Sequence, residues 1–152
     1  VSKLAEGGDP TRFNFPRALM KDRNLNFSFS GLKTAVLYAL DDLEEKDYPD
    51  VAASFQEAVI DVLIKKLTYA IEETGIKKLV CSGGVAANRL LRERLTDMCK
   101  TSELEVSYPK MEFCTDNAAM IAYAGFIRKK YNLKEYPTKY ARPRWPLGEL
   151  YD

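Results

Sequence analysis

The sequence contains no histidine among its 152 residues. Imidazole is the side chain that most readily moves protons near neutral pH, and it is a frequent metal ligand. Neither a histidine-based catalytic triad nor a histidine-ligated metal can therefore be complete within this sequence. A metal held here needs oxygen or sulfur ligands, or ligands from another segment.

Cysteine is scarce, with Cys81, Cys99 and Cys114 as its three occurrences. Their odd number and the lack of a Cys-x-x-Cys spacing argue against a disulfide framework and against a cysteine-based zinc site. This usage is typical of a reducing compartment and predicts a cytoplasmic protein.

Long apolar runs and an excess of one charge are also missing. No apolar run approaches the roughly 18 residues that span a bilayer. The 23 basic and 22 acidic residues leave a net charge of +1, which neither favours nor excludes a polyanionic partner. The chain opens without methionine at VSKLAEGGDP, which lacks the apolar core of a targeting signal. We expect a segment of a longer protein.

Four phenylalanines alternate with polar residues in two short stretches near the start of the chain. Phe13 and Phe15 lie in TRFNFP, Phe27 and Phe29 lie in NFSFS, and the turn-like KDRN separates the stretches. Alternation of this kind is typical of strands with one buried face. The pattern predicts an antiparallel pair of strands, 11–15 with 26–29, with the four rings in the core.

Two helices are predicted next. Apolar residues recur at helical spacing over 32–43, after Ser30 as the expected N-cap, and again over 52–71, after Asp50 as a candidate cap. Gly75 follows the second stretch, in the position where glycine often ends a helix.

A strand, a glycine turn, a helix and a second strand follow in LVCSGGVAANRLLRERL and the residues around it. We predict strands at 76–81 and 104–108, with the turn at 82–84 and a helix to about residue 100 between them. Strand–helix–strand order implies a parallel pair joined by a crossover connection. The sequence thus predicts an α/β fold with a mixed sheet.

The last predicted helix covers 117–131, with Thr115 or Asp116 as its cap. It is apolar on all sides, which is typical of a helix buried on more than one face. The remaining residues, 132–152, contain three prolines and are expected to form a tail along the surface, anchored by Trp145.

The carboxyl ends of parallel strands lie at the same edge of a sheet, where open α/β folds bind ligands. Gly83 and Gly84 follow the first strand, and Asp116 follows the second. We therefore expect them to face one crevice, with Asn88 one turn into the intervening helix. Helix N-termini and glycine backbone there suit an anion such as a nucleotide phosphate. Asn88 could bind a ribose or a base, and Asp116 a metal.

Simpler interpretations stay open for each of these residues. The glycines also fit an ordinary strand-to-helix connection, Asn88 fits a solvated helix position, and Asp116 fits a helix cap. Three arginines in the same helix could contact a polyanion, or could form a solvated face paired with Glu93. They are Arg89, Arg92 and Arg94.

Several motifs together resemble one family over essentially the whole chain. SGGVAANRLLRERL, FSFSGLKTAVL, CTDNAAMIAYAG and RPRWPLGEL are similar to segments of the TsaD-type proteins of tRNA threonylcarbamoyladenosine synthesis, formerly described as O-sialoglycoprotein endopeptidase-like. GGDPTRFNFPRAL resembles the segment that follows the family's YPGGP stretch. The resemblance implies an actin/Hsp70/sugar-kinase-like (ribonuclease H-like) fold with two lobes.

The resemblance also implies an activity. Family members transfer a threonylcarbamoyl group from threonylcarbamoyl-adenylate to N6 of adenosine 37 in tRNA, and in bacteria they work with TsaB-like and TsaE-like proteins. They hold one divalent metal, iron or zinc, with two histidines of an HxxxH motif and one aspartate. Asp116 matches that aspartate, Asn88 the substrate-binding asparagine, and Gly83 and Gly84 the glycines beside the nucleotide phosphates.

The chain departs from the family pattern by lacking the HxxxH half. We interpret it as a C-terminal half, with an opening loop and strand pair at 1–30, two helices at 31–75, a nucleotide- and metal-side unit at 76–131 and a tail at 132–152. No catalytic residue is identified within it, and we expect it to be inactive alone. A non-catalytic scaffold related to TsaB and a sugar-kinase-like, ATP-dependent phosphotransferase are the alternatives.

Overall fold

The computed structural model describes residues 1–133 and residue 143. It divides into two compact units, Val1–Thr115 and Asp116–Asp152, and each is described by itself. Almost all of the predicted tail at 132–152, including Trp145, lies outside the described residues. Among those residues, no helix combines the length and apolar character that crossing a bilayer requires.

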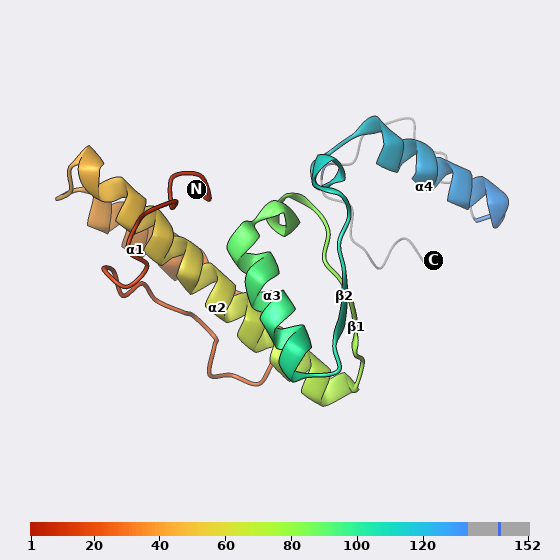
Figure 1. Ribbon diagram of the computed structural model, residues 1–152, viewed down its shortest axis with the longest axis horizontal. Helices are drawn as coiled ribbons and strands as arrows, with labels where there is room; N and C mark the ends of the chain where they lie inside the picture. The colour runs from red at the N-terminus through yellow and green to blue at the C-terminus, as the bar shows by residue number, and fades with distance from the viewer. Residues whose placement is uncertain (134–142, 144–152) are drawn as a thin grey trace. The chain divides into compact units, whose positions relative to one another are not determined.

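The first unit contains three helices and a two-stranded sheet (Figure 1). The helices are α1 (Ser30–Leu40), α2 (Tyr48–Thr74) and α3 (Arg89–Thr101). The strands are β1 (Lys78–Val80) and β2 (Glu105–Ser107). Short 3-10 turns cover Glu45–Asp47, Gly84–Ala87 and Met111–Phe113. The order β1–α3–β2 confirms the strand–helix–strand prediction.

The two strands run parallel, as predicted, and pair Leu79 with Val106 at the centre of the register. The Cys81 N–H donates to the Ser107 carbonyl at 3.0 Å and extends the ladder by one bond. Both strands are shorter than expected. The α/β class is therefore confirmed for the described residues, with a sheet that is parallel instead of mixed.

The antiparallel pair predicted at 11–15 and 26–29 is wrong, because neither stretch forms a strand. Their backbone groups bond elsewhere: the Phe13 N–H donates to Ser54 Oγ on α2 at 3.2 Å, and the Asn26 N–H donates to the side chain of Asn24. The alternating phenylalanines stack in neighbouring pairs, with ring centroids 5.7 Å apart for Phe13 and Phe15. Phe13, Phe15 and Phe29 pack in the cluster with α1 and α2, whereas Phe27 is 52% exposed, so the prediction of four core rings is wrong for Phe27.

Helix α2 is the common element of two hydrophobic clusters. Near its start, Val51 and Ala58 pack with Phe15 and with Leu32 of α1. Farther along, Ile60 packs with residues of α3 and of both strands, namely Leu91, Leu95, Leu79 and Val106. A helix of 27 residues is about 40 Å long, so it can support both clusters.

Helix α2 also fixes the turn that precedes α1. Lys66 is almost fully buried, and its Nζ donates to the carbonyls of Asp22 and Asn24 at 2.8 and 2.6 Å. An ammonium group has three protons to donate, and buried polar groups need partners. The carbonyls meet that need and hold the turn against the helix.

The helix ends differ in part from the prediction. Gly75 ends α2 with φ of +67°, and its N–H donates to the Ile71 carbonyl at 2.8 Å, as expected for a terminal glycine. Ser30, however, is the first residue of α1 instead of its cap. Asp50 lies in the first turn of α2, where it accepts bonds from the Asp9 N–H and from Arg12.

The second unit contributes helix α4 (Ala118–Lys130). Its cap is Asn117, whose side chain accepts from the Met120 N–H at 2.9 Å, so the prediction of Thr115 or Asp116 as the cap is wrong. Within the part of the chain that the structure describes, no residue of α4 is buried. The apolar composition predicted burial, whereas Ile121 and Tyr123 are about two-thirds exposed.

Candidate nucleotide-binding site

The candidate site begins where β1 ends. Gly83 has φ of +84° and ψ of 177°, a conformation that glycine adopts with little strain and other residues rarely enter. It leads into the 3-10 turn Gly84–Ala87, and α3 starts only at Arg89. The expected helix N-terminus at the glycines is therefore displaced to Asn88, and the glycine turn stands between strand and helix.

Asn88 is the N-cap of α3 and is half-buried. Its Oδ1 accepts from the Leu91 N–H at 3.0 Å, and its Nδ2 donates to Gln56 Oε1 of α2 at 2.7 Å. The solvated position considered from the sequence is thus wrong. Within the described part of the chain one of the two N–H groups of the Asn88 carboxamide bonds Gln56, which leaves the second for a ligand.

A cavity of about 310 Å³ lies between α2 and the glycine turn. Its wall is mostly apolar, with the Asn88 and Gln56 amides among the lining groups, as is usual for pockets that bind small molecules. From α2 come Phe55, Gln56, Val59 and Ile60, from the turn come Gly84, Val85, Ala87 and Asn88, and Val1 and Ser2 complete the wall.

Gln56 belongs to this site although sequence reasoning missed it. Its amide oxygen orients the Asn88 side chain across the space between α2 and the turn. The periodicity of α2 marks Gln56 simply as a polar residue beside a buried face. Gln56 could have been assigned to the site only with the knowledge that α2 packs against α3.

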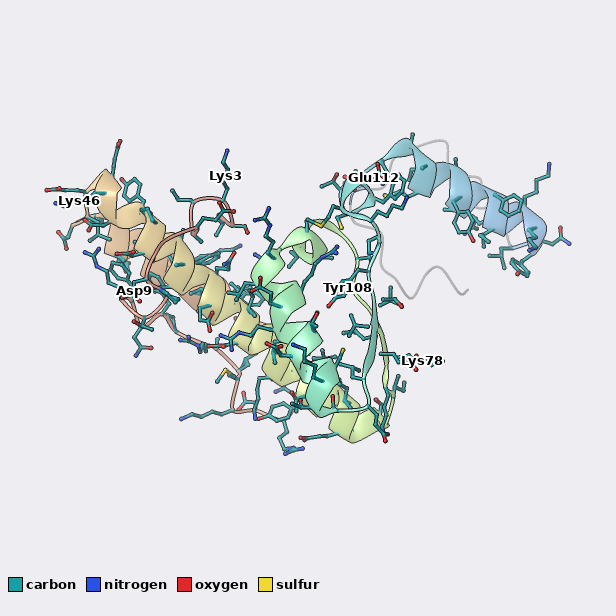
Figure 2. The ribbon with its side chains drawn as sticks, in the orientation of Figure 1. Lys3, Asp9, Lys46, Lys78, Tyr108 and Glu112 are labelled. Atoms are coloured by element: carbon teal, nitrogen blue, oxygen red, sulfur yellow. The ribbon has the colours of Figure 1, made fainter. Side chains whose placement is uncertain are left out.

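The three arginines of α3 have separate partners. Arg89 pairs with Glu6 and Arg94 with Glu57, so among the described residues the expected pairing with Glu93 is not found. Arg92 instead turns inward, with its guanidinium carbon 4.6 Å from the centroid of the Tyr108 ring. Figure 2 shows Tyr108 on the side of the sheet that faces α3, whereas Lys78 points to the opposite side.

Cys81, directly after β1, is not suited to nucleophilic chemistry. Burial raises the pKa of its thiol above the ordinary value, and the charge of Arg92 opposes that effect. A thiol with a raised pKa stays protonated near neutral pH, and the thiolate is the nucleophile.

Asp116 is exposed and belongs to the second unit. Its expected position in one crevice with Gly83 and Asn88 stays a prediction, because the two units are described separately. Among the described residues, no group of three or more histidine, cysteine, aspartate or glutamate side chains could hold a metal ion. A single carboxylate does not fit a complete transition-metal site, so Asp116 could supply at most one ligand of several.

Comparison with known proteins identifies the family. The family model described as TsaD, tRNA N6-adenosine threonylcarbamoyltransferase, matches residues 1–123. The chain belongs to the TsaD family. The match includes the glycine turn, Asn88 and Asp116, all of which lie within its bounds.

Curated relatives carry the same description. Proteins named tRNA N6-adenosine threonylcarbamoyltransferase from Herminiimonas arsenicoxydans, Methylobacillus flagellatus and Variovorax paradoxus are 44%, 47% and 46% identical to this TsaD chain. Each alignment covers 99% of the chain but 46%, 45% and 44% of the respective relative. The chain thus spans less than half the length of these relatives.

Proposed function

We propose that the whole protein is a tRNA N6-adenosine threonylcarbamoyltransferase, and that this chain forms the nucleotide-binding wall of its active site. The observation that carries the proposal is the cavity between α2 and the glycine turn, in which Gln56 orients the Asn88 amide. Family membership supports the reaction, and the cavity supports the placement of the donor substrate, threonylcarbamoyl-adenylate.

The residues of the wall have distinct roles in this proposal. Gly83 lets the chain turn sharply, and Gly84 lets backbone approach the adenylate phosphate, since no heavy atom lies within 4 Å of where its Cβ would be. Asn88 uses its remaining N–H to donate to the ribose or the base. The apolar side chains of α2 exclude water from the adenine ring.

For the metal, we propose that Asp116 provides one carboxylate ligand in the whole protein. The other ligands then come from residues outside the described part of the chain, because the described part holds too few donors. Iron or zinc is the proposed ion. The wall residues bind and orient the adenylate. N6 of adenosine 37 then forms a bond to the carbamoyl carbon and loses a proton, while the bond from that carbon to the phosphate oxygen breaks and AMP leaves.

The proposal includes partners and location. Transfer to adenosine 37 requires tRNA as the second substrate, and TsaB-like and TsaE-like proteins are the proposed partners in the cell. The cytoplasm is the proposed location, consistent with the reduced cysteines of the chain and with a tRNA substrate.

The decisive test replaces Gly84 by alanine in the whole protein. The φ of Gly84 does not lie in the left-handed region and the space around its Cβ position is open, so Gly84→Ala should fold normally. The added methyl group would keep a phosphate from the backbone, and we expect AMP affinity by calorimetry to fall about tenfold. Transfer to tRNA, measured as modified nucleoside by mass spectrometry, should fall with it.

Gly125→Ala in α4 is the matched control, because its Cβ would also enter open space and Gly125 is not among the residues that line the cavity. It should leave AMP affinity and transfer unchanged. Normal AMP affinity in Gly84→Ala would refute the placement of the phosphate. Absence of transfer by the whole protein, given donor, tRNA and partners, would refute the reaction itself.

A further inference from the structure

Arg92 is the arginine of α3 whose contacts differ in kind from those of its neighbours. Its Nε donates to the Ala86 carbonyl at 2.5 Å, and its Nη2 lies 3.3 Å from both the Pro109 carbonyl and Cys114 Sγ. The guanidinium also covers the Tyr108 ring. Among the described residues, its partners are thus neutral groups, whereas Arg89 and Arg94 pair with carboxylates.

These contacts join two loops that emerge from the same edge of the sheet. Ala86 belongs to the glycine turn after β1, and 109–114 is the loop after β2. Both strands run in the same direction, so both loops leave from their carboxyl ends. The last ladder bond is Cys81 to Ser107, and beyond it Arg92 donates to both loops from the helix between them.

The loop after β2 is held closely at this point. Cys114 is 2% exposed, accepts from Arg92 Nη2, and its own thiol donates to the Lys110 carbonyl at 3.6 Å. Two residues later the chain reaches Asp116. Whatever fixes Cys114 therefore fixes the end of the loop that leads to that aspartate in the sequence.

We propose that Arg92 is a positioning residue that fixes the loop 109–114 to the glycine turn. The guanidinium suits this role because its planar fork can donate in two directions at once, to Ala86 on one side and to Pro109 and Cys114 on the other. A lysine at this position has one compact ammonium group and cannot span both loops in the same geometry. The inference concerns the same site as the proposed function, but its first test does not depend on that function.

The test uses the burial of Cys114 as its readout, in the whole protein. Arg92→Met keeps most of the aliphatic stem and removes the guanidinium with all of its donors. We expect alkylation of Cys114 by iodoacetamide, resolved by peptide mass spectrometry, to become about tenfold faster as the loop opens locally. Cys99, which is half-buried in the structure, serves as the internal reference and should change little.

Arg94→Met is the matched control, since Arg94 lies on the same helix but pairs with Glu57 away from both loops. It should leave Cys114 alkylation unchanged. If Arg92→Met does not fold, Arg92→Lys, which keeps the charge, is used for the same measurement of Cys114 alkylation. We expect a smaller but selective rise in Cys114 alkylation for Arg92→Lys and none for Arg94→Lys.

Two results would overturn the proposal. One is a folded Arg92 variant in which Cys114 is alkylated at the same rate as in the wild type. The other is an equal rise at all three cysteines together with a lower melting temperature, which would indicate general destabilisation.

A kinetic measurement then connects Arg92 to the proposed function. A disturbed glycine turn should raise KM for the adenylate donor more than it lowers kcat. If only Cys114 becomes more reactive and KM stays unchanged, Arg92 fixes the loop but does not affect substrate binding. Failure of the Gly84→Ala test would refute the nucleotide site without affecting the Cys114 result.

Discussion

At the scale of single residues, Asn88 combines two tasks in one amide. Its oxygen caps α3, and its nitrogen binds Gln56 of the neighbouring helix. The cap fixes the rotamer, and Gln56 fixes the direction of the second N–H. A side chain held in this way is oriented before a ligand arrives, which reduces the entropy lost on binding.

Substitutions of Asn88 should separate these tasks. Asn88→Ala removes the cap and should lower the free energy of unfolding by about 1 kcal/mol. Asn88→Asp keeps a cap acceptor, and the Gln56 amide can rotate to donate to the new carboxylate, so stability should change less. Its negative charge faces the proposed phosphate site, and AMP affinity should fall most in this variant. Urea unfolding and calorimetric titration measure the two effects, and AMP binding by Asn88→Asp at wild-type affinity would contradict the proposal.

Single residues also show where sequence reasoning succeeds. Gly75 and the turn at Gly83 were predictable because glycine is preferred for positive φ whatever surrounds it. Lys66 and Arg92 were not, because charged residues on a helix are normally assigned to solvent. Lys66 bonds a carbonyl 44 residues away, and Arg92 bonds one carbonyl six residues away and another 17 residues away, a combination that no local pattern reveals.

At the scale of elements, the opening segment is attached to the start of α2 by charge. Arg12 contacts Asp47 and Asp50, both at 2.7 Å. Hydrogen bonds from Arg12 are the main cause of the lowered pKa of each aspartate, with backbone N–H groups adding to the effect. The segment that carries Phe13 and Phe15 is thereby kept beside the helix on which these rings pack.

This attachment should be sensitive to acid. The native pKa of each aspartate lies below its ordinary value of 3.8, so the contacts stabilise the fold at neutral pH and weaken as the pH falls below 3.8 toward the native values. Arg12→Gln should lower the urea midpoint at pH 7, and its difference from wild type should shrink as the pH falls below 3.8. Lys78→Gln removes an exposed pair with Glu105, away from both aspartates, and should show neither effect. A difference that stays constant down to pH 2.5 would contradict the assignment.

Elements defined by local periodicity were predicted best. The helical stretch ending at Gly75 and the parallel strands around the glycine turn follow from patterns within a few residues. The phenylalanine stretches failed because alternation records which side chains are buried and says nothing about where backbone hydrogen bonds go. Those bonds go to Ser54 and to nearby side chains instead of a second strand.

At the scale of the whole molecule, the chain holds only part of what the proposed reaction needs. It offers a proposed wall for the adenylate and one candidate metal ligand, and it spans less than half the length of its relatives. The family motifs could propose Gly83, Gly84, Asn88 and Asp116 as site residues, and the structure brings Gly84 and Asn88 to one cavity. The sequence could not predict how Asp116 stands relative to Asn88, because that depends on packing between the two units.

We therefore expect the 152-residue chain alone to transfer no threonylcarbamoyl group to tRNA. It has no histidine, and Asp116 by itself cannot hold a transition metal tightly. The measurement is modified adenosine in unmodified tRNA after incubation with threonylcarbamoyl-adenylate. The whole protein with its partners is the positive control, and turnover by the chain alone would show that the remaining length is dispensable.

Helix α2 also limits how this chain can change length during evolution. An inserted residue rotates everything beyond it by about 100° about the helix axis, since one turn takes 3.6 residues. An insertion near Val59 would keep the start of α2 packed against Phe15 and Leu32. It would turn the following part of α2 away from Leu91 and Leu95 of α3. Among relatives, gaps in alignments should therefore fall in the connections before Tyr48 and after Thr74, and α2 itself should keep a fixed number of residues.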